Sequence, residues 1–403
     1  MFVVIYYFIF FCVYIISIPL LLVNSLKSKY RQSIPVRFFL KDFSLCIDPH
    51  YWFHACSYGE IKSLEPIIMG MPKQPILITT ITQTGFELAS KTYANHSYIQ
   101  IKYLPFEIFI PFWKNRLKSL KTLVVTEAEL WYSFFFIAKK ISATTMLINA
   151  RISTHSYPKY KKFAWFYKNI FKLVDITLAQ EQKDVSRLQT LGAKNIKIFG
   201  NLKILSTPKV NTHYPKSSNP TIIAASTHYG EEELILKTFL ELKKTIPNIW
   251  LIVAPRHPQR FNEVARLIKK IQPTSFTFKI FSQNGFDSNC DILLIDTLGE
   301  LNNLYPIADI VILGGSFAKI GGHNPLECAF FNTKLISGPH IFNQTALFDS
   351  IDGYKIIEQN QLYKTLESYQ SLPKTRIKDQ KNKLNTLITI ITKENEWKKP
   401  TNF

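Results

Sequence analysis

The feature of this sequence that most constrains its fold is a repeated alternation of short apolar runs with helical patterns. Each run is rich in β-branched residues and stops at a turn signal, after which apolar residues recur at helical spacing. Strands joined by crossover helices build parallel sheets. The predicted strands form two series, Ile76–Thr80, Thr122–Val125, Thr144–Ile148 and Ile176–Ala179, then Thr221–Ala225, Ile249–Val253, Ile292–Ile295, Ile310–Leu313 and Lys334–Ile336.

Residues 206–220 separate the two series and contain three prolines, which mark a linker. A chain of 403 residues is long for one domain and ordinary for two. We therefore predict two doubly wound α/β domains, residues 26–205 and 221–403, with ligands at the carboxyl ends of their strands. The end of the second domain is expected to form helices that finish in a polar tail.

Residues 1–25 carry no charged side chain and are long enough to cross a bilayer, which takes about 20 residues. The run lacks the basic start and the small-residue cleavage site of a signal peptide. Lys27, Lys29, Arg31 and Arg37 follow and, by the positive-inside rule, place the rest of the chain in the cytoplasm. We predict a membrane anchor, either a spanning helix or one that lies in a single leaflet, as Pro19 and the aromatic content also suit.

Charge and cysteine usage narrow the classes of partner and compartment. The formal net charge of +20 favours a polyanionic partner, either nucleic acid, acidic phospholipid or a phosphorylated substrate. Lysines are spread along the chain without a nucleic-acid motif, so a nucleic-acid partner is not expected. The five cysteines have neither C-x-x-C nor metal-ligand spacing, which predicts reduced thiols, no disulfide framework and no zinc site.

Ser57-x-x-Glu60 has the spacing of a capping box, in which Ser57 caps a helix and Glu60 reaches back to its amide. The functional interpretation makes Glu60 a general base beside His54, which removes a proton from a sugar hydroxyl. A helix N-terminus opposes this role because it favours the carboxylate form. On the spacing alone the structural interpretation is preferred.

Three other strand ends of the first domain carry polar side chains. The hydroxyls and glycine of Thr79–Gly85 can bind an anion through backbone amides. Glu127 and Glu129 can position hydroxyls or a cationic group, and Arg151 can pair with a carboxylate or phosphate. Each segment also has an ordinary structural interpretation. Thr79–Gly85 can be a polar loop, Glu127 and Glu129 can be acids that suit a helix start, and Arg151 can be a solvated surface arginine.

The second domain has two candidate ligand loops. Arg256 and His257 lie between prolines after a strand, which favours a rigid phosphate or carboxylate clamp. Four of the 14 glycines fall at positions 314–322, before Asn324 as an expected N-cap and Glu327 in the first turn. Such a loop suits a nucleotide phosphate. It matches neither the G-x-x-x-x-G-K-[ST] loop nor the dinucleotide G-x-G-x-x-G, which disfavours an ATPase or NAD enzyme.

Taken in order, these segments resemble the Kdo (3-deoxy-D-manno-octulosonic acid) transferases, a family of GT-B-type glycosyltransferases. The segments that carry the resemblance are His54–Glu60, Thr79–Gly85, Tyr103–Phe106, Glu127–Trp131, Asn149–Ser153, Gly200–Lys203, Pro255–Pro258, Asp296–Glu300 and Gly314–Glu327. The resemblance implies two Rossmann-like domains that face a cleft, one for the lipid acceptor and one for CMP-Kdo, with no cofactor and no catalytic metal.

The resemblance also implies roles for residues, with Glu60 as the catalytic base. The acceptor-binding candidates are His54, Ser57, Gly59, Thr80, Thr82, Thr84, Glu127, Glu129 and Arg151. The donor-binding candidates are Arg256, His257, Gly315, Ser316, Gly322, Asn324 and Glu327. The sequence departs from the family pattern at Ala128, Tyr132 and Ser133, where Thr, Pro and Asn are usual, and at Tyr58, which is usually small and aliphatic.

The expected activity is inverting, metal-independent transfer of Kdo from CMP-Kdo to the lipid A precursor lipid IVA. The catalytic domains are expected on the cytoplasmic face of the inner membrane, against its anionic leaflet. The alternatives are another GT-B transferase, or a sugar-nucleotide epimerase, with a different donor. A basic membrane-attached protein that binds nucleic acid is the rival from another class.

Overall fold

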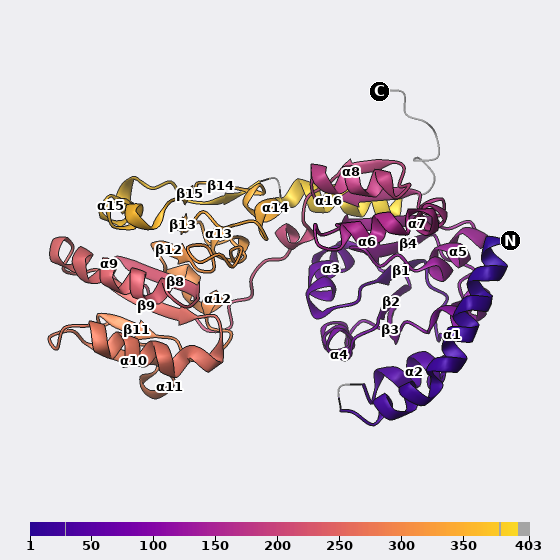
Figure 1. Ribbon diagram of the computed structural model, residues 1–403, viewed down its shortest axis with the longest axis horizontal. Coiled ribbons are helices and arrows are strands. Elements are labelled where there is room, and N and C mark those ends of the chain that lie inside the picture. Colours follow the sequence, from indigo (N-terminus) through magenta and orange to yellow (C-terminus); the bar gives the residue numbers. More distant parts are fainter. Residues whose placement is uncertain (29, 379, 394–403) are drawn as a thin grey trace. The chain divides into compact units, whose positions relative to one another are not determined.

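The computed structural model describes residues 1–28, 30–378 and 380–393 (Figure 1). The chain divides into two compact units. Unit 1 comprises Met1–Ser206 together with the C-terminal segment from Lys381, and unit 2 comprises Thr207–Gln380.

Unit 1 contains a parallel sheet of seven strands in the order β3-β2-β1-β4-β5-β6-β7. The strands are β1 (Tyr51–His54), β2 (Ile76–Thr80), β3 (Ile99–Tyr103), β4 (Thr122–Thr126), β5 (Thr144–Ala150), β6 (Ile176–Ala179) and β7 (Ile196–Ile198). The helices are α1 (Phe2–Ser25), α2 (Ser33–Phe38), α3 (Tyr58–Gly70), α4 (Gln83–Thr92), η1 (Glu107–Arg116), α5 (Tyr132–Lys140), α6 (Tyr157–Lys162), α7 (Ala164–Phe171), α8 (Gln182–Thr190), η2 (Leu202–Leu205) and α16 (Gln380–Thr392).

Unit 2 repeats this plan with a seven-stranded parallel sheet in the order β10-β11-β9-β8-β12-β13-β15. Its strands are β8 (Thr221–Thr227), β9 (Trp250–Pro255), β10 (Phe278–Ile280), β11 (Ile292–Leu294), β12 (Ile310–Leu313), β13 (Lys334–Ser337) and β15 (Tyr354–Ile356), with an antiparallel pair β14 (Ile351–Asp352) and β16 (Arg376–Ile377). The helices are α9 (Glu231–Thr245), η3 (Pro258–Arg260), α10 (Phe261–Ile271), α11 (Phe281–Asn284), α12 (Leu301–Leu304), η4 (Tyr305–Ile307), α13 (Leu326–Ala329), α14 (Thr345–Phe348), η5 (Gln359–Gln361), α15 (Leu362–Glu367) and η6 (Tyr369–Ser371).

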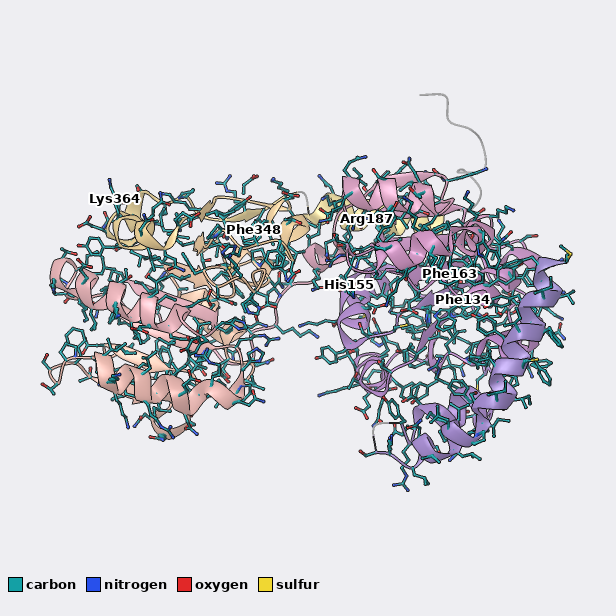
Figure 2. All side chains as sticks on the ribbon, in the orientation of Figure 1. Phe134, His155, Phe163, Arg187, Phe348 and Lys364 are labelled. Carbon is teal, nitrogen blue, oxygen red and sulfur yellow. The ribbon has the colours of Figure 1, made fainter. Side chains whose placement is uncertain are left out.

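The central strands are apolar along their whole length because both faces of each sheet are covered. Every residue of β2, β4 and β12 is buried, which is the pattern of a parallel sheet between layers of helices. Figure 2 labels Phe134, which has no exposed surface in the core of unit 1, and Phe163, which is exposed on that unit. The two predicted doubly wound sheets are thereby confirmed.

Both sheets reverse their strand order beside their first strand. In unit 1 the first strand β1 lies between β2 and β4, and in unit 2 the first strand β8 lies between β9 and β12. At such a switch point the loops that follow the two neighbouring strands diverge and leave room for a ligand. The loops after β1 and β4, and after β8 and β12, are therefore the places to look for chemistry.

The prediction that residues 221–403 form one domain is wrong at its C-terminal end, because α16 belongs to unit 1. Leu387 and Ile391 of α16 are buried. The Thr122 hydroxyl at the start of β4 donates to the carbonyl of Ile391 at 2.9 Å. The amphipathic pattern of a helix predicts that it packs, but not on which domain. The predicted polar tail, residues 394–403, lies outside the described residues.

The linker segment is anchored to unit 2. Residues 206–220, all of them described, contain neither helix nor strand. The Asn211 amide donates to the side chain of Asn303 at 2.8 Å, and the Tyr214 hydroxyl donates to Glu300 at 2.8 Å. The segment thus continues the surface of unit 2 up to the start of β8.

Helix α1 packs along unit 1 through one edge and exposes the rest of its apolar surface. Phe2, Tyr6, Phe10 and Tyr14 recur at a four-residue spacing and contact unit 1 through aromatic rings. The Tyr6 hydroxyl donates to the buried carboxylate of Glu107 at 2.5 Å. Among the described residues α1 is the one helix long and apolar enough to cross a membrane, with a mean hydropathy of 2.4.

Candidate active site

The predicted capping box at the start of α3 is present. Ser57 has extended backbone, and its hydroxyl accepts from the Glu60 amide at 3.3 Å. Oε1 of Glu60 in turn accepts from the Ser57 amide at 3.2 Å and from the Ser57 hydroxyl at 2.7 Å. The structural interpretation of Ser57-x-x-Glu60 is therefore correct, and any chemical role of Glu60 must operate from this position.

The second oxygen of Glu60 connects the loop after β1 to the end of β4. Oε2 accepts from the Cys56 amide at 3.1 Å and from the Thr126 hydroxyl at 2.6 Å. Four donors thus use the roughly four acceptor sites of a carboxylate. The amides of Cys56 and Ser57 are fixed, whereas the two hydroxyls can rotate away. Ser57 is partly exposed and Thr126 is buried, so the Ser57 hydroxyl is the donor that an incoming hydroxyl can replace.

Further charged groups lie beside Glu60 at the same end of the sheet. Burial and the nearby Glu60 carboxylate raise the pKa of Glu127, whereas Arg151 and Lys203 lower it. Glu127 and Asn149 both have a left-handed backbone, with φ of 54° for each, a conformation that is uncommon outside glycine and is concentrated at functional sites. Lys203, from the Gly200–Lys203 segment, is a further basic group beside Glu127 that was not among the predicted site residues.

The threonines after β2 mainly support the loop that carries Cys56. The hydroxyls of Thr80 and Thr82 donate to the carbonyl of Cys56 at 3.0 and 2.6 Å. The Thr82 hydroxyl also accepts from the Gly85 amide at 3.2 Å and so caps α4. The prediction of an anion site at the amides of this loop therefore fails at Gly85, whose amide is already bonded. Thr84 is exposed.

The remaining unit 1 candidates differ in how accessible they are. Gly59 is exposed, and an added Cβ there meets nothing within 4 Å. Glu129 is partly exposed and accepts from the Trp131 indole at 2.7 Å. His54 has no exposed surface and contacts Thr79 and Cys56 instead. This placement gives His54 a supporting position behind the loop, in contrast to the predicted contact with an acceptor.

In unit 2 the glycine-rich loop binds an anion of the protein itself. The carboxylate of Glu231, which is buried at the start of α9, accepts from the amides of four successive residues. The distances are 2.7, 3.0, 2.9 and 3.2 Å for Gly315, Ser316, Phe317 and Ala318. Our prediction that these amides bind a nucleotide phosphate is therefore wrong, because Glu231 already occupies them.

Glu231 was missed from the sequence, although a signal for it exists. Glu231–Glu233 follow β8, and the glycine-rich loop follows β12, the neighbouring strand. Acids after one strand and bare amides after the next meet at the switch point of the sheet. Ser316 belongs to the same framework, because it is buried and its hydroxyl accepts from the Gly338 amide at 2.8 Å.

Basic side chains gather beside this loop. Arg256 and His257 follow β9 and are exposed. The Nε2 atoms of His228 and His323 lie 2.7 Å apart, and the His228 and His257 rings are 5.2 Å apart. Burial, with the charges of His228, Arg256 and His257, lowers the pKa of His323 to about 4. Arg256 and His257 thus form the accessible part of a basic group that fits an anionic ligand.

The turn into α13 carries the other donor candidates. Asn324 accepts from the Leu326 amide at 3.1 Å and donates to Glu327 at 3.2 Å. The prediction of Asn324 as the N-cap is nevertheless wrong, because Pro325 is the N-cap residue of α13. The helix begins at Leu326, one residue later than predicted, and has four residues. Gly315 and Gly322 have φ of 69° and 80°, conformations that favour glycine. At Gly315 a Cβ would lie 3.0 Å from the His323 ring.

Comparison with known proteins places this arrangement in a family. Residues 29–206 match the family model described as 3-deoxy-D-manno-octulosonic-acid transferase (kdotransferase). The 3-deoxy-D-manno-octulosonic acid transferase of Haemophilus influenzae is 34% identical over 367 residues, which cover 85% of this chain and 84% of that protein. The enzyme of the same name from Aquifex aeolicus is 30% identical over 345 residues, which cover 84% and 91%.

Among solved structures, the UDP-GlcNAc 2-epimerase of Neisseria meningitidis bound to UDP-GlcNAc matches with a TM-score of 0.56 at 13% identity, over 84% of this chain and 98% of that one. At this identity the likeness concerns the fold alone, and it agrees with the predicted GT-B class. The sequence relatives decide the family. The chain belongs to the 3-deoxy-D-manno-octulosonic acid (Kdo) transferase family of glycosyltransferases.

Proposed function

We propose that this protein transfers Kdo from CMP-Kdo to lipid IVA, with inversion, with Glu60 as the base and without a catalytic metal. The observation that carries the proposal is the position of Glu60 at the switch point of unit 1. There its carboxylate is held by two fixed amides, by the buried Thr126 hydroxyl and by the replaceable Ser57 hydroxyl. A carboxylate oriented in this way can accept a proton from one further hydroxyl that takes the place of a rotating donor.

The base step follows from that geometry. The attacking hydroxyl of the acceptor displaces the Ser57 hydroxyl from Oε1 of Glu60, while Thr126 keeps its bond to Oε2. The proton passes to Glu60 as the acceptor oxygen forms a bond to the anomeric carbon of Kdo. The bond from that carbon to the phosphate oxygen breaks, and CMP leaves from the opposite face, which inverts the configuration.

The donor is assigned to unit 2. CMP-Kdo carries a phosphate and a carboxylate, both of which suit the exposed side chains of Arg256 and His257. Because Glu231 occupies the loop amides, these side chains, rather than the glycine-rich backbone, are the groups that stabilise the departing phosphate. Glu327, positioned by Asn324, is available for the ribose hydroxyls.

The acceptor is a lipid with two phosphates, which calls for an enzyme at an anionic membrane surface. The exposed apolar side chains of α1 and the net charge of +20 support a position against the cytoplasmic leaflet of the inner membrane. Arg151 and Lys203 lie beside Glu127 and provide positive charge for an acceptor phosphate at the same end of the sheet as Glu60.

The proposal is tested by incubating membranes that contain the protein with radiolabelled lipid IVA and a CMP-Kdo generating system, and by resolving the lipids by thin-layer chromatography. We expect a slower product with the native protein and none with Glu60→Gln. Glu87→Gln, an exposed acid on α4, is the matched control. Excess UDP-sugars should not compete. No product from folded protein, alongside an active reference enzyme, would overturn the proposed donor and acceptor.

A further inference from the structure

Three potential metal ligands meet at the switch point of unit 1. They are His54 at the end of β1, Cys56 in the loop that follows, and Glu129 after β4. One ligand atom from each lies within 4.8 Å of the others. His54 is fully buried and Cys56 is 6% exposed. The proposed transfer reaction uses neither the His54 ring nor the Cys56 thiol.

The separation of two of these atoms fits a tetrahedral ion. Nε2 of His54 and Sγ of Cys56 are 3.6 Å apart. A zinc ion with bonds of about 2.3 Å to sulfur and about 2.0 Å to nitrogen, at a tetrahedral angle, holds those two atoms roughly 3.6 Å apart. The same separation also allows a hydrogen bond from the thiol to the ring, which satisfies both groups when no ion is bound.

One tautomer of His54 leaves Nε2, the nitrogen that faces Cys56, free of a proton. The Thr79 hydroxyl accepts from the Trp52 indole at 2.8 Å and donates to the Phe53 carbonyl at 3.3 Å. With that hydroxyl hydrogen on the Phe53 carbonyl, Nδ1 of His54, 2.9 Å away, is the donor to the Thr79 oxygen. In this tautomer the lone pair of Nε2 points towards Cys56. Metal-bound histidines are commonly oriented by such a bond from the other nitrogen.

The charges around the three ligands also suit a divalent ion. On coordination the Cys56 thiol releases its proton to solvent, and the thiolate and the Glu129 carboxylate then balance two positive charges. Arg37, Glu60 and Glu127 also face these ligands. The charge of Arg37 is opposite to that of Glu60, and Arg151 and Lys203 face Glu127.

We propose that His54, Cys56 and Glu129 form a binding site for a thiophilic divalent cation, with Zn²⁺ as the expected ion and its fourth position open. One nitrogen, one sulfur and one carboxylate oxygen are the ligand types that zinc takes. The sequence-based expectation of no zinc site considered only spacing along the chain. It did not consider that β1 and β4 are neighbours.

Such an ion acts as an inhibitor, a consequence that rests on the proposed role of Glu60. The Cys56 amide donates to Oε2 of Glu60 at 3.1 Å, so the ion and the base share one loop. An ion bound to the Cys56 thiolate holds this loop in place, and with it the Glu60 carboxylate that the Cys56 amide contacts. It also engages Glu129, one of the acceptor candidates. The site thus couples availability of a thiophilic metal to the rate of transfer.

The binding claim is tested with Co²⁺ as a spectroscopic probe on the full-length protein in detergent after chelator treatment. We expect one equivalent of Co²⁺ to produce a thiolate-to-cobalt charge-transfer band in the native protein. The band should be absent in Cys56→Ala and unchanged in Cys290→Ala, a buried cysteine of unit 2. Glu129→Gln should weaken binding by at least about tenfold, the loss typical of even outer-shell partners. A native protein without the band, or a band that persists in Cys56→Ala, overturns the site.

The inhibition claim has a separate readout. Each variant is compared with its own metal-free rate in the Kdo transfer assay. Zn²⁺ should inhibit the native protein and Cys290→Ala, with recovery on addition of chelator, and should leave the rate of Cys56→Ala unaffected. Equal inhibition of Cys56→Ala refutes the coupling. If no transfer occurs at all, the proposed function fails while the cobalt band still decides the binding site.

Discussion

At the scale of single residues, the four donors around Glu60 determine what its carboxylate can do. Capping of α3 requires Ser57 and the Glu60 backbone, whereas chemistry requires a carboxylate oxygen that can gain a partner. The two hydroxyl donors differ in burial, with Ser57 partly exposed and Thr126 buried. That difference assigns Thr126 to orient the base and Ser57 to give way to substrate.

Thr126→Val should lower kcat because it removes the bond that keeps Oε2 in place while preserving the shape of the side chain. A hydrogen bond to a charged group contributes about 1.5–3 kcal/mol, which corresponds to a fall of about tenfold to a hundredfold in rate. Thr126→Ser retains the hydroxyl and should keep most of the activity. The measurement is kcat at saturating acceptor, and an unchanged kcat in Thr126→Val would refute the orienting role.

His54 should make the protein sensitive to acid. Burial, and secondly the charge of Arg37, lowers its pKa to about 3, compared with about 6.5 in an unfolded chain. Above pH 6.5 neither state binds the proton and the native state carries no penalty. As the pH falls below 6.5 only the unfolded state gains the proton, so stability decreases towards pH 3.

The loss from pH 6.5 to 5 should approach about 2 kcal/mol, since each unit of pKa difference corresponds to about 1.4 kcal/mol. Urea unfolding followed by tryptophan fluorescence at the two pH values measures it. His54→Asn should lose less stability over this interval than the native protein. His50→Asn, at a partly exposed position, is the control and should behave as the native protein does. Identical pH dependence in all three proteins would contradict the assignment.

At the scale of elements, the central strands other than β1 were predictable, whereas the edge strands β3, β7, β10 and β15 and the contacts between loops were not. All nine predicted strands exist because buried parallel strands are continuous apolar runs. Strand β1, Tyr51–His54, was missed because four residues that end in histidine lack that pattern. Glu231 meets the glycine-rich loop, and Cys56 meets Glu129, only because of strand order, which the local sequence does not encode.

The contact between Glu231 and the glycine-rich loop makes a prediction about anions. Glu231→Ala should free the four loop amides and the amide of His228, and destabilise unit 2 by at least about 3 kcal/mol, because each unpaired buried amide costs about 1–3 kcal/mol. The vacated amides form a concave site for an anion, so sulfate should raise the Tm of this variant more than that of the native protein.

Glu233→Ala, which removes an exposed acid from the same turn of α9, corrects for the general stabilising effect of sulfate. Thermal unfolding with sulfate or chloride at equal ionic strength gives the comparison. If Glu231→Ala does not fold, Glu231→Gln, which retains one acceptor oxygen, replaces it. Sulfate should again raise the Tm of this variant more than the Tm of the native protein. Equal sulfate responses in the native protein and the Glu231 variants would show that the loop amides are already open to anions.

At the scale of the whole molecule, two properties direct the protein to an anionic membrane. One is the net charge of +20, which acts at a distance and is screened by salt. The other is α1, whose outer surface is apolar while its inner edge is fastened to unit 1 by the Tyr6–Glu107 bond. Burial of apolar surface does not depend on ionic strength in the way that charge attraction does.

These two contributions should separate in flotation with vesicles that contain anionic lipid. At 1 M salt the Debye length is about 3 Å, so the electrostatic part is lost. The native protein should nevertheless float with the vesicles, because apolar side chains of α1 stay inserted. Replacement of Phe8, Ile16 and Val23 by Asn removes apolar area at positions of α1 that are exposed. This variant should bind in low salt and be released in high salt. Retention of the variant at 1 M salt would show that another surface holds the protein to the bilayer, and release of the native protein would show that charge alone does.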